Sequence, residues 1–371
     1  MYLWERPGWP ALSWDEKALS TLLASVSRRQ GLVLGRMEAL GFHLRDEAHL
    51  QTLTEDVVKS SEIEGEDLDR DQVRSSIARR LGLDAGGLLP ADREVEGVVE
   101  MMLDATGKYE ESLTEERLFA WHTSLFPTGR SGMRKIIVGK WRDDRTGPMQ
   151  VVSGPAGRER VHYEAPPAER LPEEMARFLS WFEDPGDIDP LLTAGLAHLL
   201  FVTIHPFDDG NGRIARAIAD MVLSRSESSR RRFYSMSAQI RRERNDYYAI
   251  LESTQKGGVD VTQWQTWFLS CLLRAIEGAH GILGFVLRKA RFWERFATEP
   301  LNERQIAILN RLLDGIEGKL TTSKWAKMAK CSQDTAYRDI LDLVRRGALQ
   351  KDAGGGRSTS YSLAWREPDS R

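Results

Sequence analysis

The sequence predicts an all-α protein, a helical bundle with a small β-hairpin in its middle part. Apolar residues recur at the three- and four-residue spacing of helices through most of the 371 residues. β-Branched residues gather around glycine turns near residues 149–165 and again near residues 347–363. These changes of pattern divide the chain into three predicted domains, at residues 1–92, 93–290 and 298–366.

Composition argues against several classes of protein. The net charge of −3 produces no strong field toward nucleic acid or membranes. The two cysteines, Cys271 and Cys331, lie far apart without a pairing or zinc-binding pattern. The first residues lack the layout of a signal peptide, and no apolar run reaches bilayer length. We therefore expect a soluble, cytoplasmic protein with no membrane partner.

The first third of the chain reads as helices behind an aromatic arm. Three tryptophans, Trp4, Trp9 and Trp14, are expected to anchor the arm on the body of the protein. Helical spacing predicts helices over residues 15–40 and 47–59, and Asp69 is expected to cap a third that ends at Gly82.

The middle of the chain alternates helices with the hairpin. Helices are predicted over residues 94–108, 114–126, 171–183, 191–204 and 261–276. The glycines around residues 154–157 predict the turn of the hairpin. Two histidines within these helices, His122 and His198, are expected to be packing residues because no second catalytic motif surrounds them.

A polar loop interrupts this pattern at residues 205–216, which read His-Pro-Phe-Asp-Asp-Gly-Asn-Gly-Arg-Ile-Ala-Arg. Apolar helices are predicted on both sides, over residues 191–204 and 214–223. The Gly-Asn-Gly turn lets backbone N–H groups converge at the start of the second helix. Such a nest of amides binds phosphate.

The side chains of this loop suit phosphoryl-transfer chemistry. Arg213 and Arg216 lie three residues apart on one helical face, where their planar guanidinium groups can hold phosphate oxygens. Asp209 is placed to hold a Mg²⁺ ion that bridges those phosphates. His205 is the expected proton acceptor, because the unperturbed pKa of histidine suits a general base at neutral pH.

The loop resembles the signature of the Fic family, H-P-F-x-[D/E]-G-N-G-R-x-x-R. Nine fixed positions make a chance match improbable, unlike a lone glycine pattern. All nine are filled, by His205, Pro206, Phe207, Asp209, Gly210, Asn211, Gly212, Arg213 and Arg216.

The resemblance implies a protein adenylyltransferase on the helical Fic fold, with residues 93–290 as the catalytic core. AMP would pass from ATP to a Ser, Thr or Tyr hydroxyl of a target protein, with release of pyrophosphate, and self-modification is expected. The resemblance implies that His205 takes the hydroxyl proton and that Asp209 holds Mg²⁺. The phosphates would be bound by Gly210, Asn211, Gly212, Arg213 and Arg216.

Two further segments take a meaning from the resemblance. The hairpin at about residues 149–165 stands where Fic proteins carry a flap, which pairs with an extended segment of the target by strand addition. Residues 244–255 resemble the segment that closes over the nucleotide base. Tyr248 would stack on adenine and Gln255 would bind its edge, although a helix core explains the same pattern equally well.

The segment at residues 60–66 has two readings. Taken alone, Ser61 and Glu64 form a capping box at the start of a helix. However, Ser60, Glu64 and Gly65 match the inhibitory motif [S/T]-x-x-x-E-[G/N] of Fic proteins whose inhibitory helix is N-terminal. This second reading implies that Glu64 pairs with Arg216 and takes the place of the ATP γ-phosphate. The whole N-terminal stretch is similar to a domain of unknown function that precedes many bacterial Fic cores.

The C-terminal part resembles a winged helix-turn-helix domain. Helices are predicted over residues 303–313, 322–329 and 332–346, followed by a hairpin with Gly354, Gly355 and Gly356 at its tip. The exposed residues of the recognition helix would be Gln333, Thr335, Tyr337 and Arg338. Acidic Asp334, Asp339 and Asp342 on the same helix weigh against DNA binding, so a protein-interaction or dimer-supporting module remains the alternative.

Three functional alternatives remain open. Glu64 would instead position a water that removes AMP from a modified protein, as some glutamate-bearing relatives do. Other Fic relatives transfer UMP or phosphocholine. In a third reading, the chain is a DNA-binding regulator whose Fic core senses nucleotide. Related proteins often form dimers, so a homodimer is expected, and the target protein is not encoded in these patterns.

Overall fold

A computed structural model of the chain describes residues 1–83, 89–145, 147–155, 158–316, 318–353 and 359–364. The chain forms two compact units. The first comprises residues 1–81 and 90–283, and the second comprises residues 82–89 and 284–371.

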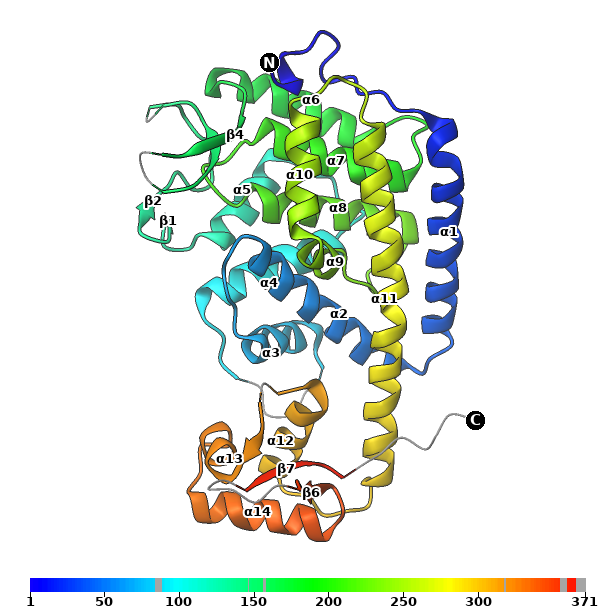
Figure 1. Cartoon of the computed structure of the whole chain (residues 1–371), viewed down its shortest axis with the longest axis vertical. Coiled ribbons are helices and arrows are strands. Elements are labelled where there is room, and N and C mark those ends of the chain that lie inside the picture. The colour runs from blue at the N-terminus through cyan, green and yellow to red at the C-terminus, as the bar shows by residue number, and fades with distance from the viewer. Residues whose placement is uncertain (84–88, 146, 156–157, 317, 354–358, 365–371) are drawn as a thin grey trace. The chain divides into compact units, whose positions relative to one another are not determined.

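The first unit is almost entirely helical, which confirms the predicted fold class (Figure 1). Three of its helices begin at a capping side chain, since Asp15, Thr114 and Asp189 each accept a hydrogen bond from a backbone amide of the helix that follows. The helices are α1 (Glu16–Glu38), α2 (Phe42–Ile63), α3 (Arg70–Leu81), α4 (Arg93–Gly107), α5 (Glu115–Leu125), α6 (Leu171–Glu183), α7 (Pro190–Ile204), α8 (Asn211–Glu227), α9 (Met236–Arg242), α10 (Arg244–Gln255) and α11 (Thr262–Arg295). Helix α11 continues into the second unit, to which its residues from Gly284 onward belong.

Helices α7 and α8 form the centre of this unit and pack against each other (Figure 1). Every residue of α7 from Leu191 to Ile204 is buried, which explains why this stretch is apolar all round and not amphipathic. Residues 205–210 connect the two helices. The polar loop therefore stands on a rigid, buried base.

Of the two readings of residues 60–66, the capping box at Ser61 and Glu64 is wrong. Helix α2 runs to Ile63, beyond the predicted end at residue 59, so both residues lie at the C-terminal end of a helix and not at its start. Gly65, with a φ of +86°, then turns the chain away. Glu64 is therefore the C-cap residue of α2, directly before the turn at Gly65.

Two short hairpins accompany the helices. Strand β1 (Arg130–Ser131) pairs with β2 (Arg134–Lys135), and β3 (Gln150–Ser153) pairs with β4 (Arg160–Glu164), both antiparallel. The second pair is the predicted hairpin at residues 149–165, although residues 156–157 of its expected turn lie outside the described residues. The first pair was not predicted, because two-residue strands have no readable alternation.

The aromatic arm packs on the body as expected. It begins with a 3₁₀ turn, η1 (Leu3–Glu5). The indole N–H of Trp4 donates to the backbone carbonyl of Glu164 at 2.9 Å, and that of Trp9 donates to the Glu174 carboxylate at 2.8 Å. The arm is thereby tied to the end of β4.

Helix α11 is longer than predicted, since it continues from residue 276 to Arg295. By length and composition it is able to cross a membrane, which corrects the expectation that no apolar run reaches bilayer length. A core helix of a globular protein passes the same test, and Trp264 and Phe268 of α11 are fully buried.

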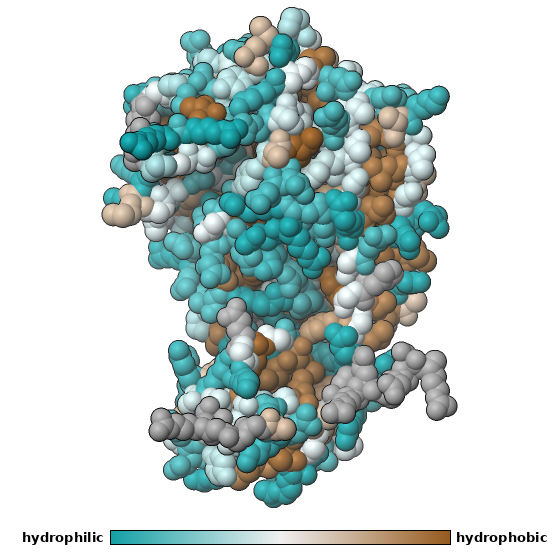
Figure 2. All heavy atoms as spheres, in the orientation of Figure 1, coloured by the Kyte–Doolittle hydropathy of each residue, from teal (hydrophilic) through white to brown (hydrophobic). Residues whose placement is uncertain are grey.

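Hydrophilic residues predominate on the face of this unit over α9 and α10 (Figure 2).

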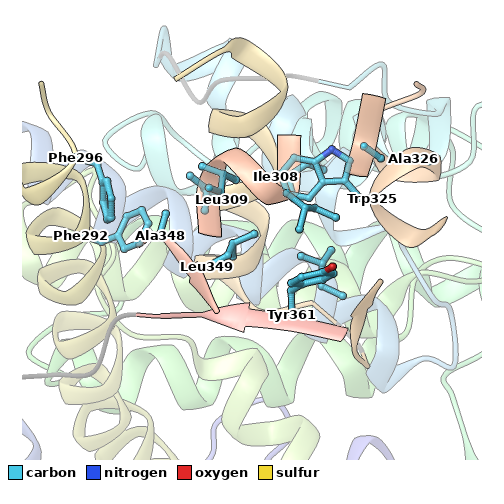
Figure 3. Close-up of a cluster of buried hydrophobic side chains, with 13 residues drawn as sticks. Phe292, Phe296, Ile308, Leu309, Trp325, Ala326, Ala348, Leu349 and Tyr361 are labelled. Carbon is cyan, nitrogen blue, oxygen red and sulfur yellow. The ribbon is translucent and has the colours of Figure 1, made fainter. Parts of the chain in front are cut away.

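The second unit contains the C-terminal part of the chain. Its elements are α12 (Glu303–Asp314), β5 (Leu320–Thr321), α13 (Thr322–Met328), α14 (Gln333–Arg345), β6 (Leu349–Lys351) and β7 (Ser360–Leu363). The strands form one antiparallel sheet in the order β5-β7-β6. Figure 3 shows its own apolar core, in which Trp325, Leu349 and Tyr361 meet. The predicted tip, Gly354 to Gly356, lies outside the described residues, and the winged-helix assignment stays a prediction.

Candidate active site

His205 ends helix α7 in a left-handed conformation, with φ 51° and ψ 58°. A residue other than glycine rarely adopts this conformation, and strained backbone of this kind gathers at functional sites. The ring Nδ1 lies 3.2 Å from the carbonyl oxygen of Val202. Since a carbonyl only accepts, Nδ1 carries the proton and Nε2 is left as the acceptor.

Burial sets the protonation state of this ring. It lowers the pKa of His205 to about 4, because the charged imidazolium would lose its water. The ring is therefore neutral at physiological pH. A neutral ring with a free Nε2 lone pair is the form that a general base requires.

Two side chains hold the loop after His205 in shape: Asn211 within the loop and Arg142, which is distant in the sequence. The Asn211 side chain accepts a hydrogen bond from the amide of Phe207 at 3.0 Å and donates to the carbonyl of Phe207 at 2.8 Å. Arg142, which is buried, donates from Nε to the carbonyl of His205 at 2.8 Å and from its amide to Pro206 at 3.0 Å. The structure thus gives Asn211 a bracing role in the loop, and Arg142 was missed by sequence reasoning.

His122 packs against the same loop. Its ring stacks on Phe207 at 4.1 Å between centroids, with 8° between planes. The amide of Gly139 donates to Nδ1, and Nε2 lies 3.2 Å from the carbonyl of Asp209, to which it donates. Burial lowers the pKa of His122 to about 4, so it is a neutral packing residue, as expected.

Asp209 and its neighbour Asp208 face different partners. One oxygen of Asp209 accepts from the amide of Gly210 at 2.6 Å and the other accepts from the hydroxyl of Ser131. Asp208 instead accepts from the amide of Ile137 at 2.8 Å, which fixes the segment before the flap. Within the described part of the chain no three His, Cys, Asp or Glu side chains group as a metal site. A single carboxylate still suits Mg²⁺, because phosphate oxygens and water usually supply its other ligands.

The two glycines of the loop lie in close contacts. Gly210 has a φ of +80°, and a β-carbon there would lie 2.9 Å from the ring of Phe126. A β-carbon at Gly212 would lie 2.2 Å from Oε1 of Glu64. The Glu64 carboxylate therefore lies against the first turn of α8, where unpaired amides and the helix dipole attract an anion.

Arg216 binds the end of α2 with three hydrogen bonds. Its Nε donates to the hydroxyl of Ser60 at 2.9 Å, and its Nη2 donates to the carbonyl of Ser60 at 2.9 Å and to Glu64 at 2.7 Å. Burial opposes the positive charge, but the Glu64 carboxylate raises the pKa of Arg216 above its ordinary value. The structure thus brings together three of the residues predicted for inhibition and phosphate binding.

Arg213 has a separate acidic partner that the sequence did not reveal. Its Nη1 donates to Oε2 of Glu66 at 2.5 Å, and its guanidinium lies 5.0 Å from the centroid of the Phe126 ring. Burial raises the pKa of Glu66, while Arg213 acts in the opposite direction. Both arginines of the loop therefore contact the turn that Gly65 makes after α2.

Helix α10 contacts the C-terminal ends of α2 and α7. Tyr248 donates from its hydroxyl to the carbonyl of Ile63 at 3.3 Å, and Arg244 donates to the same carbonyl at 2.8 Å. Gln255 is buried and donates to the carbonyl of Val202 at 3.2 Å, beside the ring of His205. Contact of Tyr248 and Gln255 with adenine stays a prediction.

Comparison with known families and proteins identifies two regions. Residues 2–83 match a domain of unknown function, DUF4172, and residues 112–223 match the Fic/DOC family. The chain is 34% identical over 130 residues to a protein adenylyltransferase Fic of Nematostella vectensis, covering 33% of this chain and 29% of that protein. It is 38% identical over 60 residues to protein adenylyltransferase fic-1 of Caenorhabditis elegans, covering 16% and 12%. The matched region thus spans less than a third of these relatives.

The fold is shared with a solved structure. A crystal structure of a Fic family protein from Desulfovibrio desulfuricans G20 superposes with a TM-score of 0.53 and 22% identity, covering 95% of this chain and 97% of that one. At this identity the likeness concerns the fold.

Proposed function

Because this chain carries a Fic domain at residues 112–223, we propose that it transfers AMP from ATP to a hydroxyl side chain of a target protein. The observation that carries the proposal is the state of His205. Its Nδ1 faces the Val202 carbonyl and its pKa is lowered to about 4, which leaves Nε2 as a proton acceptor at the end of a rigid helix. The related proteins named adenylyltransferase support the same reaction.

In the proposed reaction, the target hydroxyl attacks the α-phosphorus of ATP. A new bond forms between the hydroxyl oxygen and phosphorus, the bond from phosphorus to the pyrophosphate oxygen breaks, and pyrophosphate leaves. His205 Nε2 accepts the hydroxyl proton as the nucleophile arrives. Positioning and charge stabilisation supply most of the rate, since the protein forms no covalent bond itself.

The phosphates would lie at the start of α8, where the amides of its first turn, Arg213 and Arg216 converge. Arg213 and Arg216 are each 2% exposed, so their interaction with a phosphate would be only weakly screened by water. Asp209 would hold Mg²⁺, which neutralises phosphate charge when bound. Asn211 and Arg142 keep the loop in the shape that this arrangement needs.

We further propose that Glu64 inhibits this reaction. Its carboxylate already occupies the anion-binding end of α8 and pairs with Arg216. A γ-phosphate would need the same arginine. ATP would therefore bind weakly, or in a pose that does not expose the α-phosphorus to the acceptor.

The acceptor would approach along the flap. Among the described residues, β3 pairs with β4 alone, so its other edge is available for strand addition. A hollow of about 400 Å³ lies beside that edge, lined by Arg134, Asp143, Met149, Val152 and Asp208, among others. Main-chain pairing there would present a hydroxyl without demanding much of the target sequence.

The decisive experiment uses ATP labelled at either the α- or the γ-phosphate. The Glu64→Gly variant incubated with Mg²⁺ is expected to label itself from the α position and not from the γ position. The His205→Ala variant in the same background should lose at least a hundredfold in rate, as loss of a general base does. Label transferred from the γ position would contradict the proposal and indicate a kinase.

The C-terminal unit offers a second candidate function, contact with DNA through α14. Two of the three acids that weigh against it are engaged within the unit. Asp339 is buried and binds Arg304, and Asp342 binds Arg346. Exposed Gln333, Tyr337 and Arg338 remain on the outer face, whereas Thr335 is half-buried. A gel shift of the full chain against random duplexes tests this, and no shift at low salt would exclude it.

A further inference from the structure

The flap contains one residue more in β4 than in β3. Val151 pairs with Tyr163 and Val152 pairs with Val161, so His162 between them has no partner in the ladder. An extra residue of this kind is a β-bulge, and bulges beside functional sites redirect a side chain. Here the redirected side chain is an imidazole.

The ring of His162 joins the two strands to helix α10. Its Nδ1 lies 2.6 Å from Oε2 of Glu252, and its Nε2 lies 2.6 Å from the hydroxyl of Ser153 on β3. Because the carboxylate only accepts, Nδ1 donates to Glu252. In the neutral ring Nε2 then accepts from the hydroxyl of Ser153. One side chain therefore links β3, β4 and α10.

Glu252 accepts hydrogen bonds from two further side chains. Arg160 of β4 donates to Oε1 at 3.0 Å, and Lys256, one turn along α10, donates to the same oxygen at 2.6 Å. Lys256 together with His162 and Arg160 lowers the pKa of Glu252 to about 2. The carboxylate thus stays charged throughout the range in which the protein works.

The same helix reaches the catalytic ring three residues later. Gln255 donates to the carbonyl of Val202, which also faces Nδ1 of His205. The hydroxyl of Tyr163, the residue after His162 in β4, donates to the carbonyl of Thr203 at 2.5 Å. The flap is therefore fixed to the end of α7 directly through Tyr163 and indirectly through Glu252 and α10.

We propose that Glu252 and His162 are positioning residues for the acceptor, which hold the edge of β3 at a fixed distance and register from Nε2 of His205. The inference rests on the proposed AMP transfer. Neither residue touches the reacting atoms. Their role is to keep the strand that receives the target from sliding or tilting, so that the hydroxyl meets the base.

The test compares Glu252→Gln and His162→Gln with Lys256→Met, all in the Glu64→Gly background of the full chain. Lys256→Met is the matched control, because it removes a partner of Glu252 without touching the flap. Amide hydrogen exchange of residues 149–153 and 158–164 should rise about fivefold in the first two variants and stay unchanged in the control. Transfer of α-labelled AMP should fall about tenfold while the KM for ATP stays within about twofold.

The exchange and transfer rates together test the proposed link between the flap and α10. Unchanged exchange in the flap of Glu252→Gln would overturn the proposed link, and faster exchange with unchanged transfer would show that the link has no catalytic use. An equal effect of Lys256→Met would assign the result to the stability of α10. If the Glu64→Gly background itself transferred no AMP, the proposed function would fail and the positioning role with it. Equal melting temperatures verify that the variants fold.

Discussion

The carboxylate of Glu64 lies in the space that a β-carbon on Gly212 would occupy, with its Oε1 only 2.2 Å from that position. The two residues are far apart in the sequence, since Glu64 directly follows α2 and Gly212 lies in the first turn of α8. The contact places a negative charge at the site where a phosphate would bind. Four predictions concern this contact and its surroundings.

Replacing Glu64 with glycine should raise the rate of self-labelling with AMP roughly ten- to hundredfold, the range that loss of one charge-assisted hydrogen bond permits. The measurement is transfer of α-labelled AMP at saturating Mg²⁺. Glu62→Gly is the control, since Glu62 lies in the same turn but pairs with Lys59 and Arg241. A rate that stayed level or fell, together with lost removal of AMP from a modified protein, would favour the AMP-removing alternative.

Replacing Glu66 with glutamine should lower the KM for ATP by a few-fold, because Arg213 would be released from its ion pair to bind phosphate. The pair is partly exposed on the Glu66 side, so a smaller effect than that of Glu64→Gly is expected. Glu62→Gln again serves as the control. An unchanged KM would show that Glu66 does not compete with ATP.

Gly212→Ala should destabilise the parent protein by about 1 kcal/mol, because the new methyl group would displace the end of the Glu64 side chain and weaken its hydrogen bond with Arg216. In the Glu64→Gly background most of this cost should vanish. Thermal melts of the four variants in a double-mutant cycle measure the coupling. Gly210→Ala is the matched control, since its clash with Phe126 should cost the same in both backgrounds. Additive costs for Gly212→Ala would contradict the contact.

The rate of AMP transfer should stay nearly constant between pH 7.5 and pH 5.5. A histidine with the ordinary pKa of 6.5 would lose about tenfold over this range as its ring becomes protonated. Burial lowers the pKa of His205 to about 4, so the ring stays neutral and active as the pH falls. The pH profile of kcat/KM in Glu64→Gly checks this, with circular dichroism to verify folding at each pH. A midpoint near 6.5 would show that the ring is solvated in the working enzyme.

Local patterns predicted much of this molecule. The expected cap at Asp69 and the spacing of apolar residues located helices α1 and α3 within a few residues of their ends. The polar loop was recognisable because its residue types are dense and ordered. Glu64 was found through its motif with Ser60 and Gly65.

The residues that were missed act over long distances in the sequence. Arg142 lies 63 residues before His205, and Ser131 lies 78 residues before Asp209. Neither belongs to a periodic pattern, so nothing local distinguishes them from surface residues. Glu66 directly follows Gly65 of the proposed inhibitory motif, yet only the turn at Gly65 brings it to Arg213. Helix α2 was ended too early because polar Ser60, Ser61 and Glu62 hide its last turn.

Arg216 donates two of its three hydrogen bonds to Ser60 and only one to Glu64. Removal of the glutamate would leave the guanidinium tied to the same helix, already oriented for a phosphate. Under the proposed inhibition, helix α2 would therefore contribute to phosphate binding through Ser60 as well as carry the inhibitory Glu64 at its end. Removal of the whole of α2 and removal of the Glu64 carboxylate alone are therefore different perturbations. Only the second would leave Arg216 held in place by Ser60 and available to bind ATP.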